Sequence, residues 1–405
     1  MLVLSFPAKS QISIEGMFRP RTEFRNGYRQ LRTPATEPSF FISQRTRLKA
    51  GYKSKKYGLS ISAQDVRVWG EVEQLQDNAN INVHEVYGEL FFYPKLTLRA
   101  GRQELVYDNH RLLGNVNWTQ QGRSHDALRL RFKDEDTELS ADVGLAYNQE
   151  GENILNNDFT LNNYKTLAYF WLHKTYGAFQ FSALTLSDGF QTQPDLIKFR
   201  YTYGTQINYS TGSLLLTGEA YGQSGDDANR NDISAYMWAF STNYRWQNFQ
   251  LTVGYDYLSG GGAEDKNPQR KSFNTLYATN HKFYGTMDYF LNIPADTRNG
   301  GLQDLYLSAR YNFSDLMDIK LDIHHFALED NIQSPNNPAR ILDKRLGLEF
   351  DNHFSYRFAE DVSIQFGYSL LLPNSALEII QNKTDARDIQ HWGWAMLVVT
   401  PKFMK

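Results

Sequence analysis

The sequence of 405 residues predicts an all-β fold: a transmembrane antiparallel β-barrel of about 18 strands with short periplasmic turns and long extracellular loops. Three observations lead to this prediction. Segments that alternate apolar and polar residues recur along the chain, their connections alternate between short and long, and Trp, Tyr and Phe make up 14% of the residues. A helical membrane protein is excluded, because a spanning helix needs roughly 18 consecutive apolar residues.

Each predicted strand places apolar residues on one face and polar residues on the other, as period-two alternation requires. In 199–209, for example, Phe199, Tyr201 and Tyr203 share one face, and Arg200 and Thr202 share the other. The predicted strands are 11–25, 39–53, 57–72, 83–92, 96–106, 123–132, 137–147, 164–173, 178–188, 198–209, 213–223, 233–246, 249–258, 302–313, 318–327, 343–353, 361–372 and 391–403.

The lengths of the connections distinguish a membrane barrel from a soluble β-sandwich, which would show the same alternation. Short turns at 54–56, 93–94, 133–136, 210–212, 247–248 and 314–316 alternate with long loops at 26–38, 107–122, 148–163, 259–301, 328–342 and 373–390. This asymmetry is typical of bacterial outer-membrane barrels. The strands also exceed the five or six residues usual in sandwiches. We therefore expect an integral protein of the bacterial outer membrane, in contact with its lipid and lipopolysaccharide.

Composition narrows the remaining possibilities. The chain has no cysteine, which removes disulfides, thiol nucleophiles and thiolate metal sites. A net charge of -3 argues against a nucleic-acid partner. Residues 1–10 read as the remnant of a secretory signal peptide or as a disordered N-terminus, and residues 11–405 as one barrel domain.

Basic side chains gather on the polar face of the first six strands, which would face the lumen. Acidic Glu85 and Glu89 lie among them. The basic residues are Arg19, Arg21, Arg45, Arg47, Lys49, Arg67, Arg99, Arg129 and Arg131. Rings of Arg and Lys favour anions in pores, and the guanidinium fork matches a carboxylate. The alternative is that these side chains pair with Glu and Asp across the wall and only brace the barrel.

Two positions complicate the strand faces. Pro20 lies within the first strand, where it cannot donate to the ladder, so a bulge is expected there. In the third strand Leu59 and Ile61 share a parity with Asp65 and Arg67, so the register is expected to slip near Ser62.

Four segments resemble the alginate-export family of outer-membrane barrels. The longest are GRQELVYDNHRLLGNVNWTQQGRSHDALRLRF (101–132) and FNTLYATNHKFYGTMDYF (273–290), with RPRTEFRNGYR (19–29) and QDVRVWGE (64–71) consistent with the first and third strands. The resemblance implies an eighteen-stranded barrel whose Arg-rich constriction passes an anionic polyuronate. It adds Arg111, Trp118 and Arg123, in or beside the first block, to the lumen residues above. One feature departs from the family: every short-side connection is only a few residues, so a plug from the periplasmic side is not expected.

The sequence contains few patterns that would indicate an enzyme or a metal site. No spacing of His, Ser and Asp indicates a hydrolase, and no HExxH or phosphate-loop motif occurs, so an enzyme is not expected. No cofactor or metal is expected either. Asp226, Asp227, Asn229 and Asp232 have the ligand type of a Ca²⁺ site, but a solvated loop is the simpler interpretation. His281, Lys282 and Asp288 either fold inward and narrow the pore or form a packing core within their loop.

The sequence thus predicts a porin-like channel that passively conducts anionic solutes, with uronate or alginate-type oligo- or polysaccharides as the expected substrates. The alternative is a barrel sealed by its long loops that serves as a structural partner of other envelope proteins.

Overall fold

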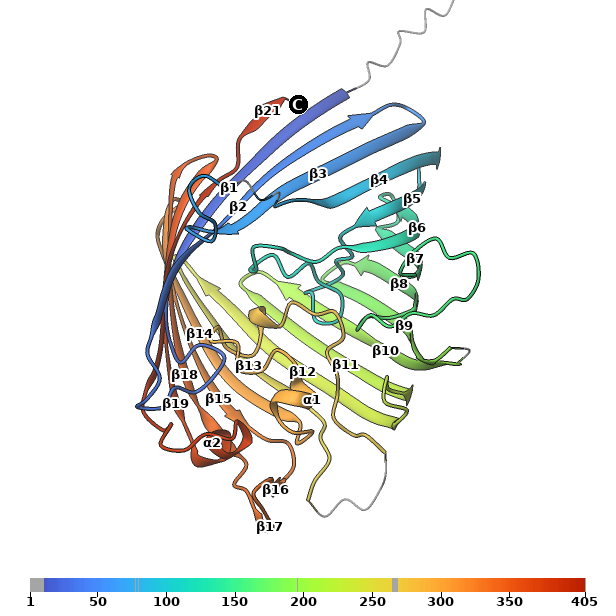
Figure 1. Ribbon diagram of the computed structural model, residues 1–405. Helices are drawn as coiled ribbons and strands as arrows, with labels where there is room; N and C mark the ends of the chain where they lie inside the picture. The colour runs from blue at the N-terminus through green and yellow to red at the C-terminus, as the bar shows by residue number, and fades with distance from the viewer. Residues whose placement is uncertain (1–10, 77, 79, 195, 264–268, 405) are drawn as a thin grey trace, which may run out of the picture.

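The protein is described by a computed structural model, which covers residues 11–76, 78, 80–194, 196–263 and 269–404. The expectation for residues 1–10 therefore lies outside the described residues. Within them, the chain forms a closed antiparallel barrel in which each strand of the wall pairs with the wall strands before and after it, and β1 pairs with β20 and β21. Figure 1 shows this wall, with the segment that carries α1 and the segment after β5 lying between its sides.

The barrel has eighteen strand positions, because β20 and β21 together make the last one. The strands are β1 (Gln11–Asn26), β2 (Ser39–Lys53), β3 (Tyr57–Val68), β4 (Ile81–Tyr93), β5 (Leu96–Gln103), β6 (His125–Asp134), β7 (Leu139–Tyr147), β8 (Thr166–Tyr176), β9 (Phe179–Gln193), β10 (Leu196–Thr211), β11 (Leu214–Asp226), β12 (Asp232–Trp246), β13 (Phe249–Leu258), β14 (Leu302–Ser314), β15 (Met317–Ala327), β18 (Arg345–Ala359), β19 (Val362–Pro373), β20 (Gln390–Val399) and β21 (Lys402–Met404).

Small elements occupy the long connections. A hairpin of β16 (Gln333–Ser334) and β17 (Asn337–Ile341) lies between β15 and β18, and α2 (Ser375–Ile380) lies between β19 and β20. The connection between β13 and β14 carries a 3₁₀ turn (Asn280–Lys282) and α1 (Ile293–Asp296). None of the helices in the described ranges is long or apolar enough to cross a bilayer.

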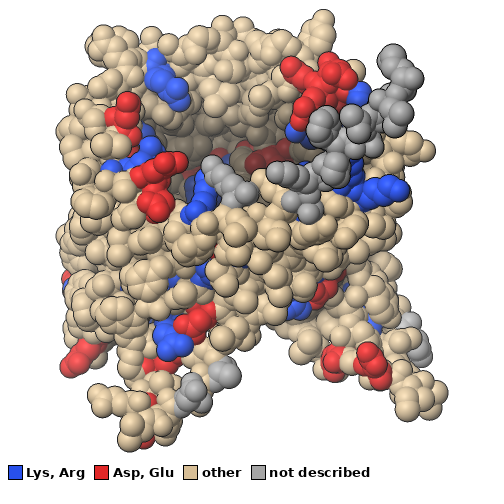
Figure 2. Space-filling model, turned by 90° about the horizontal axis from the view of Figure 1, so that it is seen from above, with Lys and Arg blue, Asp and Glu red and all other residues tan. Residues whose placement is uncertain are grey.

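The two faces of the wall follow the predicted alternation. The outward face exposes large apolar side chains, such as Leu59, Phe240 and Leu305, each at least half exposed. Aromatic residues including Tyr201, Tyr203, Tyr236 and Trp246 are exposed on the same face, as the aromatic girdles of a membrane barrel require. The lumen face instead carries buried Arg, Asp, Glu and Gln. Seen from above, the molecule is hollowed, and acidic and basic side chains gather around the hollow (Figure 2).

The register resolves the two irregular positions. Pro20 pairs with Gln44 in an unbroken β1–β2 register, so the bulge predicted at Pro20 is wrong. Only the pairing with β20 is interrupted, at Arg19 and Pro20, which fits the missing N–H of proline. The register does shift near Ser62, but the extra residue is His84 on β4, since Ser62 pairs with Glu85 and Ala63 with Val83.

Because that bulge lies on β4, the predicted face of one residue of β3 is wrong. The β2–β3 register runs without a break from Ser43–Val68 to Lys53–Gly58, so the faces of β3 do not exchange. Arg67 consequently lies on the outward face with Leu59 and Ile61, where it forms an ion pair of 2.7 Å with Asp65. The assignment of Arg67 to the lumen was therefore wrong.

Candidate functional site

Two long connections fold into the lumen and pair with each other there. They are the lumen loop (104–124), between β5 and β6, and the long loop (259–301), between β13 and β14. Leu113 and Tyr277 form a parallel bridge, and the amide of Gly114 donates to the carbonyl of Tyr277 at 2.9 Å. The amide of Thr279 donates to the carbonyl of His110 at 3.0 Å. Both segments that occupy the lumen are thus long connections from the extracellular side of the barrel.

Arginines of β1 and β2 clamp the lumen loop to the wall. Arg19 donates to the carbonyls of Asn117 and Thr119, both at 2.8 Å, and to Oε1 of Gln120 at 2.9 Å. Arg45, which is fully buried, donates to Oδ1 of Asn117 at 2.7 Å. These two arginines face each other across the β1–β2 pair. Since like charges directly opposite repel, the loop oxygens between them supply the negative partial charge that the pair needs.

A second pair of contacts extends the clamp along the same wall. Arg21 donates to the carbonyl of Trp118 at 2.7 Å, and its guanidinium carbon lies 4.1 Å from the Trp118 ring centroid. Its other partner is Glu23, at 2.8 Å. Trp118 also stacks on His281 at 4.4 Å and meets Trp394 edge-on at 4.9 Å. This indole therefore joins both lumen segments to the wall.

Glu104 anchors the start of the lumen loop. Its Oε1 lies 2.8 Å from Nε2 of His84, its Oε2 accepts from Asn115 at 2.8 Å, and Arg47 lies 3.9 Å away. Burial alone would raise the pKa of Glu104, but these hydrogen bonds and the positive charge of Arg47 outweigh it and lower the pKa. The ionised carboxylate is thus the form that the docked loop favours.

Arg111 ties the lumen loop to the opposite side of the barrel. Its guanidinium lies 2.5 Å from Asp256 on β13 and 3.4 Å from Glu219 on β11, and donates to the hydroxyl of Tyr284 at 3.1 Å. Burial alone would lower the pKa of Arg111, but the two carboxylates overcome that effect and raise it well above its ordinary value. The charge of Arg111 is therefore neutralised within the protein, and the role of this residue is structural.

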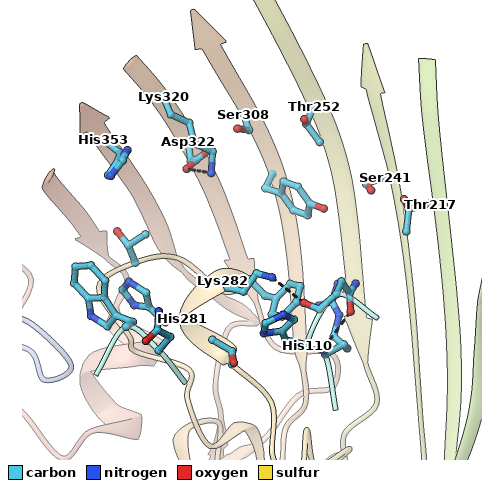
Figure 3. A pocket seen from close by; sticks show the side chains of 18 of the residues that line it. His110, Thr217, Ser241, Thr252, His281, Lys282, Ser308, Lys320, Asp322 and His353 are labelled. Carbon is cyan, nitrogen blue, oxygen red and sulfur yellow. Dashed lines mark hydrogen bonds and ion pairs between the residues drawn. The ribbon is translucent and has the colours of Figure 1, made fainter. Parts of the chain in front are cut away.

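A vestibule of about 1320 Å³ lies beneath the paired loops. Figure 3 shows its wall, where Thr217, Ser241, Thr252 and Ser308 project from consecutive strands, with His110, His281 and Lys282 of the lumen segments across from them. Lys320 and Asp322 form an ion pair of 2.7 Å on this wall. Among the predicted site residues, Arg19 and Arg111 line the vestibule, as does Trp118.

The remaining predicted lumen residues mostly have acidic partners. Arg129 pairs with Asp142 on β7, Arg99 with Glu89 at 2.8 Å, and Lys49 with Glu85 at 3.4 Å. Arg131 is 3.9 Å from Asp142 and its side chain is 37% exposed. These pairs support the bracing interpretation for this part of the wall. Arg123 lies instead beside a second cavity and donates to the carbonyl of Ala278 at 3.0 Å.

The two alternatives for the long loop both apply. Lys282 turns inward and lines the vestibule, while His281 and Asp288 form a packed pair at 2.7 Å. In the loop at 227–231, Asp227 accepts from Asn231 and pairs with Arg270 at 3.0 Å, and Asp226 pairs with Lys198 at 3.2 Å. Those carboxylates are engaged by donors of the protein, and the described residues contain no cluster of three or more metal-binding side chains.

Sequence reasoning missed the acidic side of the lumen. Buried carboxylates recur on β11 to β18, opposite the basic wall: Glu219, Asp256, Asp304, Asp322, Glu349 and Asp351. They could have been found by applying the same parity to the later strands, where each falls on the polar face. Some hold the long loop in place, since Glu349 accepts from the amide of Met287 at 2.7 Å and Asp351 from the hydroxyl of Thr286 at 2.5 Å.

Several solved structures share this architecture, one of them a porin. The chain is similar to OccAB1 of Acinetobacter baumannii (13% identity, 99% of this chain and 98% of that chain, TM-score 0.66) and to OccK9 (OpdG) of Pseudomonas aeruginosa (13%, 97% and 98%, TM-score 0.64). A BenF-like porin from Pseudomonas fluorescens is similar at 12% identity, with 98% and 100% covered and a TM-score of 0.62. At these identities the likeness establishes the fold.

The family is identified from the sequence rather than from the fold. No curated protein matches the chain. The family model described as alginate export matches residues 10–388, which is nearly the whole chain. With the closed barrel and its channel-forming neighbours, this match establishes an integral protein of the outer membrane with a porin-like fold. The chain belongs to the alginate export family of outer-membrane β-barrels.

Proposed function

We propose that the protein is a passive channel for anionic solutes, with uronate or alginate-type saccharides as the substrate class. The observation that carries the proposal is the unneutralised positive charge at the constriction. Arg19 and Arg45 form no ion pair within the described residues, and their acceptors are uncharged: oxygens of the lumen loop and, for Arg45, also the sulfur of Met17. Uncompensated cations in a narrow, low-dielectric passage attract anions.

The vestibule offers the other contacts that a uronate needs. The positive charge of Arg19 would attract the carboxylate, since Arg19 reaches the vestibule beside the rings of Trp118 and Trp394. On the facing wall, Thr217, Ser241, Thr252 and other neutral groups present hydroxyls and amides suited to sugar hydroxyls. Glu85 and Glu89, on the basic wall, would limit how tightly any one site holds an anion.

The runner-up is a loop-sealed barrel that acts as a structural partner in an envelope complex. The mutual pairing of the lumen loop and the long loop, and the arginine clamp on residues 117–120, favour it. The family and the fold indicate a transporter rather than an enzyme. We also propose that residues 11–405 act as one domain, because the sheet closes on itself.

The test is the reversal potential of the purified barrel in a planar bilayer under a KCl gradient. We expect anion selectivity in the parent and a shift toward cations in Arg19→Gln, whose amide keeps a donor for the loop carbonyls. Arg102→Gln is the matched control, because Arg102 lies on the outward face in an ion pair with Asp126. Cation selectivity in the parent would overturn the proposal, and the absence of any conductance would support the sealed barrel.

A further inference from the structure

The second cavity of the protein passes through the barrel wall. It has a volume of about 570 Å³ at the extracellular ends of β3 to β7. Gln64 and Tyr277 line it from the lumen side, yet Arg102 and Asp126 line it too. Arg102 pairs across the strands with both Asp126 and the exposed Val86, which places all three on the outward face. Residues of both faces of one sheet can line a single cavity only where the sheet is open.

The path of the lumen loop explains the opening. β4 pairs with β5 only as far as Val86 and Arg102, because the chain leaves the wall after Gln103 to enter the lumen. Residues 81–85 of β4 therefore have no strand partner on that side. The pairing of β6 with β7 begins only at Leu128 and Leu145. Taking the lumen loop out of the wall thus leaves a side window between the ends of β4 and β7.

The window carries one unneutralised cation. Arg102 and Asp126 neutralise each other at 2.8 Å. Arg123, behind them, has the carbonyl of Ala278 as its hydrogen-bonded acceptor and makes no ion pair within the described residues. Burial lowers the pKa of Arg123 from its ordinary value, yet an arginine stays protonated at physiological pH. Within the described residues its remaining N–H groups have no acceptor, so an anion in the cavity would meet an available guanidinium.

A buried imidazole near Arg123 is paired at only one of its two nitrogens. His125 is only 5% exposed, its Nδ1 lies 2.8 Å from the hydroxyl of Tyr164, and its Nε2 has no hydrogen-bond partner among the described residues. Buried polar atoms are rarely left unpaired unless a ligand or water completes them. Amide side chains also line the cavity, among them Asn82, Asn148 and Asn163. Such amides provide both donors and acceptors for hydroxyl groups.

We propose that the side window is a binding site for an anionic saccharide, with Arg123 holding its carboxylate or phosphate and the amides of Asn82 and Asn148 holding its hydroxyls. Two sources present this chemistry at the outer surface: a free uronate in the medium and the head group of lipopolysaccharide in the outer leaflet. The site goes beyond the channel proposal and is independent of it. Binding is measured without conduction, so each proposal can fail while the other stands.

The first experiment measures binding of D-galacturonate to the detergent-solubilised full chain by isothermal titration calorimetry, with D-galactose as the neutral comparison. We expect galacturonate to bind more tightly than galactose and Arg123→Gln to weaken it about tenfold or more, since a charge-assisted hydrogen bond is lost. Asn82→Trp, which fills the window, should weaken binding without removing the cation. The matched control is Lys133→Gln, an exposed residue that pairs only with Glu135 across a short turn.

The second experiment identifies the source. A photo-cross-linking amino acid at position 82 reports whether lipopolysaccharide enters the window in cells, with and without Arg123→Gln. A lipopolysaccharide adduct that Arg123→Gln abolishes assigns the window to the lipid head group. Galacturonate binding sensitive to Arg123 and Asn82, without an adduct, assigns it to a soluble saccharide. The proposal is overturned if galacturonate binding is unchanged in both variants and no Arg123-dependent adduct forms.

Discussion

Buried arginines in this barrel use two different kinds of acceptor. Arg111 is neutralised by carboxylates, whereas Arg19 and Arg45 are held by carbonyl and amide oxygens of the lumen loop. The difference matters because a carboxylate cancels the charge and a carbonyl does not. That most of the basic side chains of the first six strands face the lumen was predictable from the alternation of those strands. Their partners were not, since Asn117 and Gln120 lie about a hundred residues away in the chain.

The first prediction concerns Arg111. Arg111→Met leaves Asp256 and Glu219 buried without their cation, and breaking a buried pair costs about 3–5 kcal/mol. We expect the free energy of unfolding, measured by urea titration in lipid vesicles, to fall by about that amount. Arg102→Met, which breaks an exposed pair, should cost no more than about 1 kcal/mol. Equal effects of the two substitutions would contradict the role given to Arg111.

The second prediction concerns the pH dependence that Glu104 confers. The pKa of Glu104 is lower in the folded protein than in the unfolded chain, so its contribution is fully present above the unfolded value of about 4.3. That contribution is lost as the pH falls through the lower folded pKa. Between about pH 5 and pH 3, the melting temperature of the parent should therefore fall more steeply than that of Glu104→Gln.

The control for this pH dependence is Glu135→Gln, which removes a carboxylate at an exposed turn. Its melting curve should keep the pH dependence of the parent. If Glu104→Gln retained that dependence as well, the anchoring of the lumen loop by an ionised Glu104 would be excluded.

At the scale of the element, most strand positions followed from the sequence. Period-two alternation is a local property, and all eighteen predicted strands correspond to observed ones within a few residues, apart from the C-terminal ends of β9 and β18, which extend beyond the predicted 178–188 and 343–353. The β16–β17 hairpin was not predicted, because two and five residues give too short an alternation to detect. The face of Arg67 was also missed, because the bulge that signals a register shift is on β4 and leaves β3 unchanged.

Adjacent strands are further locked by glycines that lie beneath aromatic rings. In four directly opposed pairs, a Cβ on the glycine would overlap its partner: Gly144–Tyr169, Gly204–Tyr221, Gly254–Tyr306 and Gly367–Trp394. The ring covers the exposed backbone of the glycine, as an aromatic residue does when it rescues a glycine in a sheet. The pairing became visible only when the register was known.

The third prediction follows from this packing. Gly254→Ala drives a methyl group into Tyr306 and should lower the free energy of unfolding by about 1–3 kcal/mol. Gly218→Ala is the matched control, because nothing lies within 4 Å of its added Cβ. Heat-induced mobility shift of the folded barrel on a gel compares the two. Equal melting temperatures for the two variants would show that the packing of Tyr306 over Gly254 does not contribute to stability.

At the scale of the whole molecule, a basic wall on β1 to β6 faces an acidic wall on β11 to β18, and the two lumen segments connect them. The long loop is held on the acidic side by Glu349 and Asp351, through Met287 and Thr286. The width of the passage therefore depends on interactions between loop and wall rather than on the number of strands.

The fourth prediction tests this dependence. The double substitution Glu349→Ala and Asp351→Ala removes the acceptors of residues 286 and 287, so the long loop should leave the lumen more often and single-channel conductance should rise. Asp318→Ala is the control, since Asp318 pairs with Arg310 and its partner lies on the wall. Unchanged conductance in the double variant would show that other contacts fix the loop.

The sequence by itself determined the barrel, its strand count, its sidedness and the basic face of its first strands, because side-chain alternation and loop length are local patterns. Only the tertiary structure decided which charges are neutralised, where the wall opens and how the lumen is filled. The physical reason is that the acceptors of Arg19, Arg111 and Arg123 lie on segments distant in the chain. A period of two specifies the face of a residue but not the partner it meets there.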